Sequence, residues 1–248
     1  MIRSKLLDLV MSNSGGVQEE LWALVPASGV GSRMKSDRPK QYLQIHNRYI
    51  LDHTLFRLLS VPNLTGIMLV LSDDDPFWPR SNFANHPKVH TAIGGMERFN
   101  SVLNGLYELE GIASDEAWIM VHDAARPCVR VSDIETLIDV SKRHDGGLLG
   151  LPAKDTIKLV GAERKVKTTV DRSRIWMAFT PQMFRVGQLR SAIEQAIEKK
   201  EMITDDASAM ELAGYEPVMV EGAADNIKIT HPEDLVLAQW YLEQQRSL

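Results

Sequence analysis

A loop of small residues followed by two cations is the part of this sequence best suited to chemistry. The loop runs Pro26-Ala27-Ser28-Gly29-Val30-Gly31-Ser32-Arg33-Met34, and Lys40 follows shortly after it. Because alanine, serine and glycine leave the backbone uncovered, the N–H groups of such a loop can approach phosphate oxygens closely. Arg33 and Lys40 add positive charge at the loop's edge. This combination predicts a site for a polyanionic ligand, and a nucleoside triphosphate is the obvious candidate.

Two better-known glycine loops bind nucleotides, and the residues argue against both. The dinucleotide fingerprint needs a small third residue so that helix and strand can pack closely, and Met34 is too bulky for that position. The Walker loop ends in Gly-Lys-Ser/Thr, which is absent. The remaining pattern, Gly-x-Gly-x-Arg-Met with a later Pro39-Lys40, is similar to the loop of nucleotidyltransferases that make activated sugars and polyols. An ordinary glycine turn with a solvated Arg33 is the alternative.

The segment His122-Asp123-Ala124-Ala125-Arg126-Pro127 directly follows an apolar strand, Trp118–Val121. A carboxylate at the carboxyl end of a sheet strand can hold a ribose hydroxyl or a Mg²⁺ ion that carries phosphates, and Asp123 has that position. The two alanines permit close approach of a ligand. We interpret His122 as a structural histidine, and Arg126 fits a structural ion pair as well as a ligand contact.

Two further segments are candidates for ligand contact. The turn Gly94-Gly95-Met96-Glu97-Arg98-Phe99-Asn100-Ser101 opens a predicted helix, and its backbone and Ser101 can read a base edge. A plain strand-to-helix turn is the alternative. Lys228 is expected inside a short, otherwise apolar strand within 225–230, where a lysine is unusual unless it faces an anion. A lysine that extends from an edge strand into water is the alternative.

Composition limits the classes of protein. The 248 residues suit one α/β domain, which we place at 21–248, after a flexible N-terminal tail at 1–20. The net charge of −5 gives no global basic field for nucleic acid. No apolar run reaches membrane-spanning length. The single cysteine, Cys128, excludes an internal disulfide and favours a reducing, cytoplasmic location.

Apolar strands alternate with amphipathic helices along most of the chain. Strands are predicted at 21–25, 66–72 and 118–121, and helices around 50–59 and 102–109. Further helices should open at three N-cap signals: Ser132, Thr204 and Thr230. This order predicts an α/β fold, a Rossmann-like three-layer sandwich with a mostly parallel sheet. Ligands of such sheets bind beyond the carboxyl ends of the strands.

One stretch breaks this alternation. Residues 156–160 and 166–170 are polar and β-branched, with a Gly161-Ala162-Glu163 turn region between them, and they predict a protruding β-hairpin. The hairpin has too few apolar residues for a core of its own. We therefore interpret 152–172 as an arm that reaches a second subunit, with an ordinary edge hairpin as the alternative.

Taken together, these motifs resemble one family. The glycine loop, Pro39-Lys40-Gln41-Tyr42, the segment at 122–127, Thr169-Val170-Asp171-Arg172 and Asp225-Asn226-Ile227-Lys228 are similar to the 2-C-methyl-D-erythritol 4-phosphate cytidylyltransferases, the IspD family. The resemblance runs from about residue 21 to the C-terminus. It implies transfer of a cytidylyl group from CTP to a polyol phosphate in the non-mevalonate isoprenoid pathway, with Mg²⁺ as cofactor and a homodimer as the active form.

The resemblance also implies residue roles. Catalysis would rest on cations, namely Arg33, Lys40, Arg172 and Lys228. The nucleotide would be held by Pro26, Ala27, Ser28, Gly29, Gly95, Ser101, Asp123 and Ala124. The second substrate would contact Thr156, Arg172, Lys228 and Arg126. The metal would bind mainly phosphate oxygens, with Asp123 as a further ligand.

Two departures and two rival functions complete the interpretation. Ser28 stands where the family often has alanine, and Met96 where it commonly has an aspartate near the base. The closest rival is a cytidylyltransferase for another polyol phosphate, such as ribitol 5-phosphate. A nucleotide-binding protein without chemistry is a rival from another class, and the presence of Arg33, Lys40 and Lys228 together argues against it.

Overall fold

A seven-stranded sheet organises the computed structural model, which describes residues 19–29 and 38–245. Its strands stand in the order β11-β7-β10-β6-β1-β4-β5. Every neighbouring pair is parallel except those of β10, which runs antiparallel to β6 and β7. The strands are β1 (Leu21–Pro26), β4 (Gly66–Leu71), β5 (Val89–Ile93), β6 (Trp118–Val121), β7 (Gly147–Pro152), β10 (Trp176–Arg185) and β11 (Val218–Glu221).

The apolar runs form strands because helices cover both faces of the sheet. Along β1, Ala23 and Val25 pack into one hydrophobic cluster, whereas Trp22 and Leu24 pack into another on the opposite face. Both clusters are almost wholly buried. The predicted α/β sandwich with a mostly parallel sheet is therefore confirmed.

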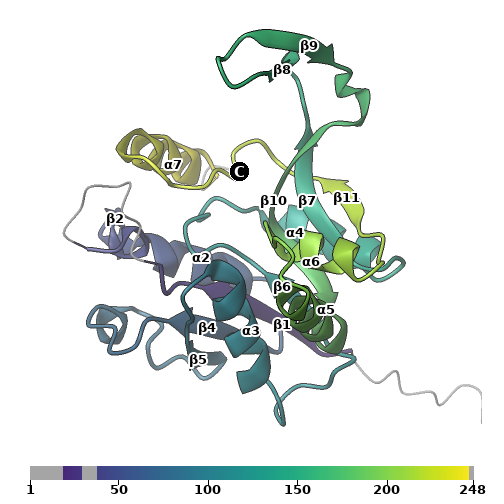
Figure 1. Cartoon of the computed structure of the whole chain (residues 1–248). Coiled ribbons are helices and arrows are strands. Elements are labelled where there is room, and N and C mark those ends of the chain that lie inside the picture. Colours follow the sequence, from purple (N-terminus) through teal and green to yellow (C-terminus); the bar gives the residue numbers. More distant parts are fainter. Residues whose placement is uncertain (1–18, 30–37, 246–248) are drawn as a thin grey trace, which may run out of the picture.

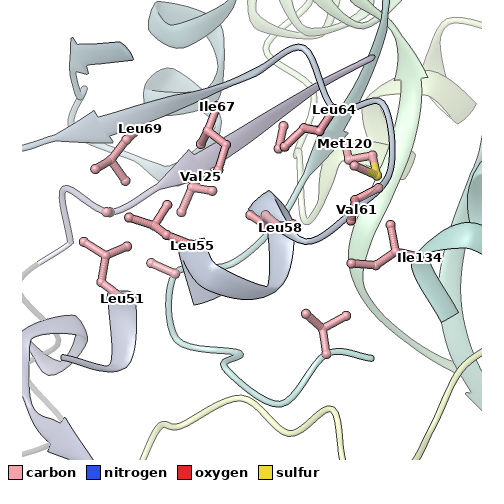
Figure 2. Close-up of a cluster of buried hydrophobic side chains, with 14 of the residues drawn as sticks. Val25, Leu51, Leu55, Leu58, Val61, Leu64, Ile67, Leu69, Met120 and Ile134 are labelled. Atoms are coloured by element: carbon pink, nitrogen blue, oxygen red, sulfur yellow. The ribbon is translucent and has the colours of Figure 1, made fainter. Parts of the chain in front are cut away.

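The helices form the two outer layers (Figure 1). One cluster takes side chains from α2 (Ile50–Leu59) and α4 (Val131–Ser141). The other takes them from α3 (Arg98–Glu108), α5 (Val186–Glu198) and α6 (Asp206–Leu212). Figure 2 shows the first cluster, where Leu51, Leu55 and Leu58 of α2 face side chains of the sheet.

The last helix, α7 (Pro232–Gln244), covers loops rather than the sheet. Its Ala238 and Leu242 pack with Ile50, Cys128 and Ile229 in a third, smaller cluster. This packing ties the C-terminal helix to the start of α2 and to the segment after β6. Those two places flank the carboxyl ends of the strands.

All three helices are present, but none of the three predicted residues is the N-cap. The helix expected at Ser132 begins at Val131, with Arg130 as N-cap and no side-chain cap. The last helix is capped by His231 with Asp234, not by Thr230 with Glu233. Near Thr204 the N-cap is Asp205, which accepts a hydrogen bond from the Ser208 N–H at 2.9 Å. Several polar residues before each helix can cap it, and the path of the incoming chain decides which one does.

The predicted hairpin is present. Strands β8 (Ile157–Val160) and β9 (Val166–Val170) form a separate two-stranded antiparallel sheet. Figure 1 shows this arm standing clear of the central sheet, between β7 and β10. Most of its side chains are exposed, Leu159 and Val166 among them. In this chain the arm therefore buries neither of its faces, as its composition predicts.

The first 18 residues of the expected N-terminal tail lie outside the described residues. Its last two residues already contact the domain. The Glu20 carbonyl accepts a hydrogen bond from the Trp118 N–H at 2.9 Å, and Glu19 forms ion pairs with Lys142 and Arg185. Within 19–29 and 38–245, no helix is both long and apolar enough to cross a membrane.

Candidate active site

A pocket of about 400 Å³ lies where β1, β5 and β6 end. Its walls come from the segments that directly follow these strands, together with the Lys40–Tyr42 turn and the segment before α7. This is the edge of the sheet at which the alternation of strands and helices predicts a ligand. The lining residues are Pro26, Ala27, Ser28, Gly29, Lys40, Gln41, Gly95, Met96, Glu97, Arg98, Ser101, Asp123, Ala125 and Lys228.

Two small-residue segments meet at one wall of the pocket. The hydroxyls of Ser28 and Ser101 lie 2.9 Å apart, and the Gly95 N–H donates to the Ser101 hydroxyl at 3.1 Å. A Cβ on Gly94 would lie 2.4 Å from the Ser28 hydroxyl, so only glycine permits this close approach. The loop after β1 and the turn before α3 are thus joined through Ser101.

A short 3-10 turn carries Lys40 into the pocket. This turn, η2 (Lys40–Tyr42), places Gln41 and Tyr42 in the interior. The Lys40 ammonium donates to the Ile229 carbonyl at 2.9 Å. The lysine is therefore held at the rim by the same segment that carries Lys228.

Asp123 is the electrostatic centre of the site. Its carboxylate forms ion pairs with Lys228 at 2.9 Å, Arg98 at 3.2 Å and Arg126 at 3.4 Å. Burial opposes ionisation of Asp123, but the three cations outweigh it and hold the pKa far below its usual range. The carboxylate is therefore ionised at neutral pH, and it gathers positive charge at the pocket.

Arg98 links the pocket to α6. Its guanidinium makes two hydrogen bonds to the buried Asp206 carboxylate, at 3.0 and 2.8 Å, and one to Asp123. Burial opposes the charge on Arg98, yet the two carboxylates raise its pKa. A bidentate arginine pair has a defined geometry, so it holds the start of α6 against the pocket wall.

His122 is a structural residue, as predicted. It is fully buried, and burial lowers its pKa to about 4. Thr180 accepts the Asp123 N–H on its hydroxyl oxygen, which leaves its O–H to donate to His122 Nδ1. The ring's Nε2–H then donates to the Arg126 carbonyl at 3.1 Å. This arrangement needs the neutral ring.

Acid should therefore destabilise the fold through His122. The unfolded chain binds a proton near pH 6.5, whereas the folded chain binds it only near pH 4. Between these values the unfolded state binds more protons, so the free energy of unfolding falls as pH falls, by roughly 3 kcal/mol in total. Urea unfolding from about pH 7 to about pH 4.5 measures this loss. His122→Gln should abolish it, and exposed His144→Gln should not; equal pH profiles would contradict the assignment.

Residues 21–244 match the model of the IspD family, 2-C-methyl-D-erythritol 4-phosphate cytidylyltransferase. The chain belongs to this family. Over 228 residues it is 50% identical to the protein of that name from Hahella chejuensis, and the aligned region covers 92% of this chain and 95% of that protein. The corresponding Vibrio vulnificus protein is 48% identical, with 92% and 96% covered.

Solved structures of the family share the fold. The Francisella tularensis 2-C-methyl-D-erythritol 4-phosphate cytidylyltransferase superposes with a TM-score of 0.77 at 37% identity, covering 90% of this chain and 99% of that chain. A crystal structure of 4-diphosphocytidyl-2C-methyl-D-erythritol synthase gives 0.79 at 33% identity, covering 92% and 100%. The resemblance to the IspD family is confirmed.

Most residues to which the family resemblance gives nucleotide roles lie on the pocket wall. These are Pro26, Ala27, Ser28, Gly29, Gly95, Ser101 and Asp123. Ala124 does not line the pocket, because its neighbour Ala125 takes that place and the Ala124 carbonyl accepts a hydrogen bond from Thr54 at 2.9 Å. In a turn of small residues, the side that faces the ligand depends on the path of the chain.

The four residues with implied catalytic roles have different positions. Lys40 and Lys228 line the pocket, and Arg33 lies outside the described residues. The strand predicted around Lys228 is wrong: residues 225–230 form an irregular segment between β11 and α7. Lys228 is nevertheless turned toward an ionised group, Asp123. Its apolar neighbours pack against α7 and not in a sheet.

Arg172 and Thr156, which the resemblance assigns to the second substrate, do not reach this pocket in their own chain. Both are exposed, at the base of the arm, where Arg172 donates to the Lys154 carbonyl. Arg126 is also absent from the lining. It donates to the Asn226 carbonyl at 2.7 Å and its guanidinium lies over the Phe179 ring at 5.4 Å, so its contacts here are structural.

Gln41 and Arg98 line the pocket as well, although no motif in the sequence points to a role for either side chain. Gln41 is buried beside Lys40, and Arg98 follows the glycine turn. Their adjacency to assigned residues was the only signal in the sequence. The hydrogen-bond partners of these two side chains are distant in sequence. Gln41 donates to the carbonyl of Ala27, 14 positions away, and Arg98 donates to Asp206, 108 positions away.

The carboxylates do not form a ready metal cage. Among the residues that the structure describes, no group of three histidine, cysteine, aspartate or glutamate side chains is placed to hold an ion. Both oxygens of Asp123 face cations. Asp123 and Glu97 are the acidic residues on the pocket wall. This donor set suits a metal that binds chiefly to ligand phosphates.

Proposed function

We infer that this chain transfers a cytidylyl group from CTP to 2-C-methyl-D-erythritol 4-phosphate and releases pyrophosphate, in the synthesis of isoprenoid precursors by the non-mevalonate pathway. The observation that carries this conclusion is family membership over residues 21–244. The pocket at the strand ends supports it, because small residues and lysines meet there around one ionised aspartate. A triphosphate and a phosphate monoester both need such a surface.

The chemistry needs cations more than a base. An oxygen of the substrate phosphate attacks the α-phosphorus of CTP, and the bond to the bridging oxygen of pyrophosphate breaks. The attacking phosphate is already anionic near neutral pH, so no strong general base is required. Catalysis then consists of bringing anions together and stabilising the charge of the transition state. Lys40 and Lys228 on the pocket wall suit this work.

We propose Mg²⁺ as the cofactor, bound with CTP. The phosphate oxygens would supply most of its ligands. Asp123 would be a further ligand if its carboxylate exchanged an ion pair with Lys228 or Arg98 for the metal. When bound, the ion neutralises phosphate charge and favours departure of pyrophosphate. Lys40 and Lys228 supply their positive charge independently of the ion.

We also propose that the active form is a homodimer in which the arm reaches the partner's pocket. Thr156 and Arg172 are exposed on this arm and lie outside their own chain's pocket. The arm leaves apolar side chains such as Leu159 and Val166 uncovered, and a second copy of the chain would bury them. In this arrangement Arg172 meets a phosphate and has a role in the reaction. Cytoplasmic location stays a prediction.

A pyrophosphate-release assay tests the function. CTP with 2-C-methyl-D-erythritol 4-phosphate should release pyrophosphate, and ribitol 5-phosphate and other polyol phosphates should release far less. Turnover of ribitol 5-phosphate at the higher rate would support the rival specificity. No release with any acceptor would support a nucleotide-binding protein without chemistry.

CTP should be clearly preferred to UTP, although Met96 stands where the family commonly has an aspartate. Met96 is almost fully exposed and has no hydrogen-bonding group, so base selection falls to backbone groups and Ser101. A donor or acceptor left unpaired in the pocket costs about 1–3 kcal/mol, and UTP would leave such a mismatch. Competition between the two nucleotides measures kcat/KM for each; equal values would refute the assignment.

A further inference from the structure

Gln41 is a buried polar side chain whose amide donates hydrogen bonds to the backbone of the glycine loop. Only 3% of the residue is exposed. Its amide Nε2 donates to the Ala27 carbonyl at 2.5 Å and to the Gly29 carbonyl at 3.3 Å. A side-chain amide has two N–H donors, so both are engaged and neither is left for a ligand phosphate. The role of Gln41 is therefore to hold the loop.

Holding these carbonyls sets the direction of the loop's N–H groups. A trans peptide is planar, so the C=O of one residue and the N–H of the next point in opposite directions. Gln41 draws the Ala27 carbonyl toward itself, and the Ser28 N–H must then point away from it. Beside it, a Cβ on Gly29 would meet no atom within 4 Å among the residues that the structure describes. The loop thus presents uncovered backbone to the pocket.

The residue that holds the loop is itself anchored. Tyr42 is fully buried, its hydroxyl donates to Asp75 at 2.8 Å, and its ring stacks on Phe77 at 5.2 Å. On the other side of Gln41, Lys40 donates to the Ile229 carbonyl. Within this turn, Tyr42 is therefore anchored in the interior, Gln41 bonds to the loop, and Lys40 places a cation in the pocket.

We propose that Gln41 is a positioning residue that orients the Ser28 amide of the loop after β1 for the triphosphate and keeps it in register with Lys40. The inference rests on the proposed function only in taking CTP as the ligand of this pocket. The side-chain amide of Gln41 would then align the loop amide and the Lys40 ammonium, both of which would contact the phosphates of CTP. A misdirected peptide loses an anion donor and turns a carbonyl oxygen toward negative charge.

Two substitutions separate the hydrogen bonds from the volume of the side chain. Gln41→Met has similar size and no donor. Gln41→Glu has the same shape, but its carboxylate faces two carbonyl oxygens and repels them. Loss of two hydrogen bonds that orient a binding loop should weaken CTP binding about 10-fold or more, with Glu worse than Met. Cytidine lacks phosphates, so its affinity should be unchanged.

Gln245→Met is the matched control. Gln245 also donates its amide to a backbone carbonyl, that of Cys128 at 2.9 Å, but it lies at the end of α7 and outside the pocket wall. Calorimetric titration with CTP and with cytidine gives the ratio of the two affinities for each variant, and melting temperatures report stability. A lower CTP-to-cytidine ratio for Gln41→Met, with the ratio unchanged for Gln245→Met, supports the proposal.

Three outcomes overturn it. An unchanged ratio for a folded Gln41→Met would make Gln41 a stability residue only. Equal loss of CTP and cytidine affinity would mean that the whole pocket has collapsed. Equal loss of the ratio in Gln245→Met would show that the effect is not specific to the loop. If Gln41→Glu does not fold, Gln41→Met decides alone. Failure of the wild-type protein to bind CTP would instead refute the proposed function.

Discussion

Replacing Lys40 with alanine should lower kcat about 100- to 1000-fold and leave KM for CTP nearly unchanged, by analogy with the loss of one oxyanion-hole donor. The lysine lines the pocket on a rigid turn beside the glycine loop. A fixed cation at this place acts most strongly on the charge that develops as the α-phosphorus is attacked. Steady-state pyrophosphate release, with both substrates varied, measures both constants. Arg33→Ala should behave in the same way, because the family resemblance gives it the same role.

Lys88→Ala is the control for the Lys40 variant. Lys88 also donates its ammonium to a backbone carbonyl, that of Leu64 at 2.6 Å, but outside the pocket. Lys88→Ala should leave kcat and KM unchanged. This result would show that loss of one lysine outside the pocket does not by itself alter the steady-state constants. A higher KM with unchanged kcat in Lys40→Ala would assign this lysine to substrate binding alone.

Mixing an Arg172→Ala chain with a Lys40→Ala chain should restore activity to about a quarter of wild type. This follows if each site uses Lys40 of one chain and Arg172 of the other, as the exposed arm suggests. In an equal, freely exchanged mixture about half the dimers are mixed, and each mixed dimer has one intact site and one site with both lesions. Pyrophosphate release from the mixture, against each variant alone, measures the gain.

A second mixture shows whether the gain depends on sharing. Lys40 and Lys228 line one pocket of one chain, so Lys40→Ala mixed with Lys228→Ala leaves every site with a lesion and should restore nothing. Subunit exchange is verified with differently tagged chains. If exchange occurs and the Arg172–Lys40 mixture stays at the level of the single variants, Arg172 acts within its own subunit and the shared site is wrong.

Local patterns in the sequence determined the layers of this fold. Runs such as 21–25 and 118–121 are apolar on both faces, and such residues are stable only in a sheet covered on both sides. The hairpin followed from its β-branched, polar composition. The small-residue loop after β1 lines the pocket, as its position after a buried strand predicts. These features depend on near neighbours, which a sequence displays directly.

Tertiary structure alone decided which charges meet. Arg98 pairs with Asp206 across 108 positions of sequence, and Lys228 joins Asp123 from an irregular segment that is held by α7 and not by a strand. The buried amide of Gln41 faces the carbonyls of Ala27 and Gly29 because the anchored side chain of Tyr42 fixes the turn at 40–42 that carries Gln41. Such pairs arise from the order of strands in the sheet and from the paths of the connecting segments. Residue types show that a charge needs a partner, but long-range packing determines which partner is within reach.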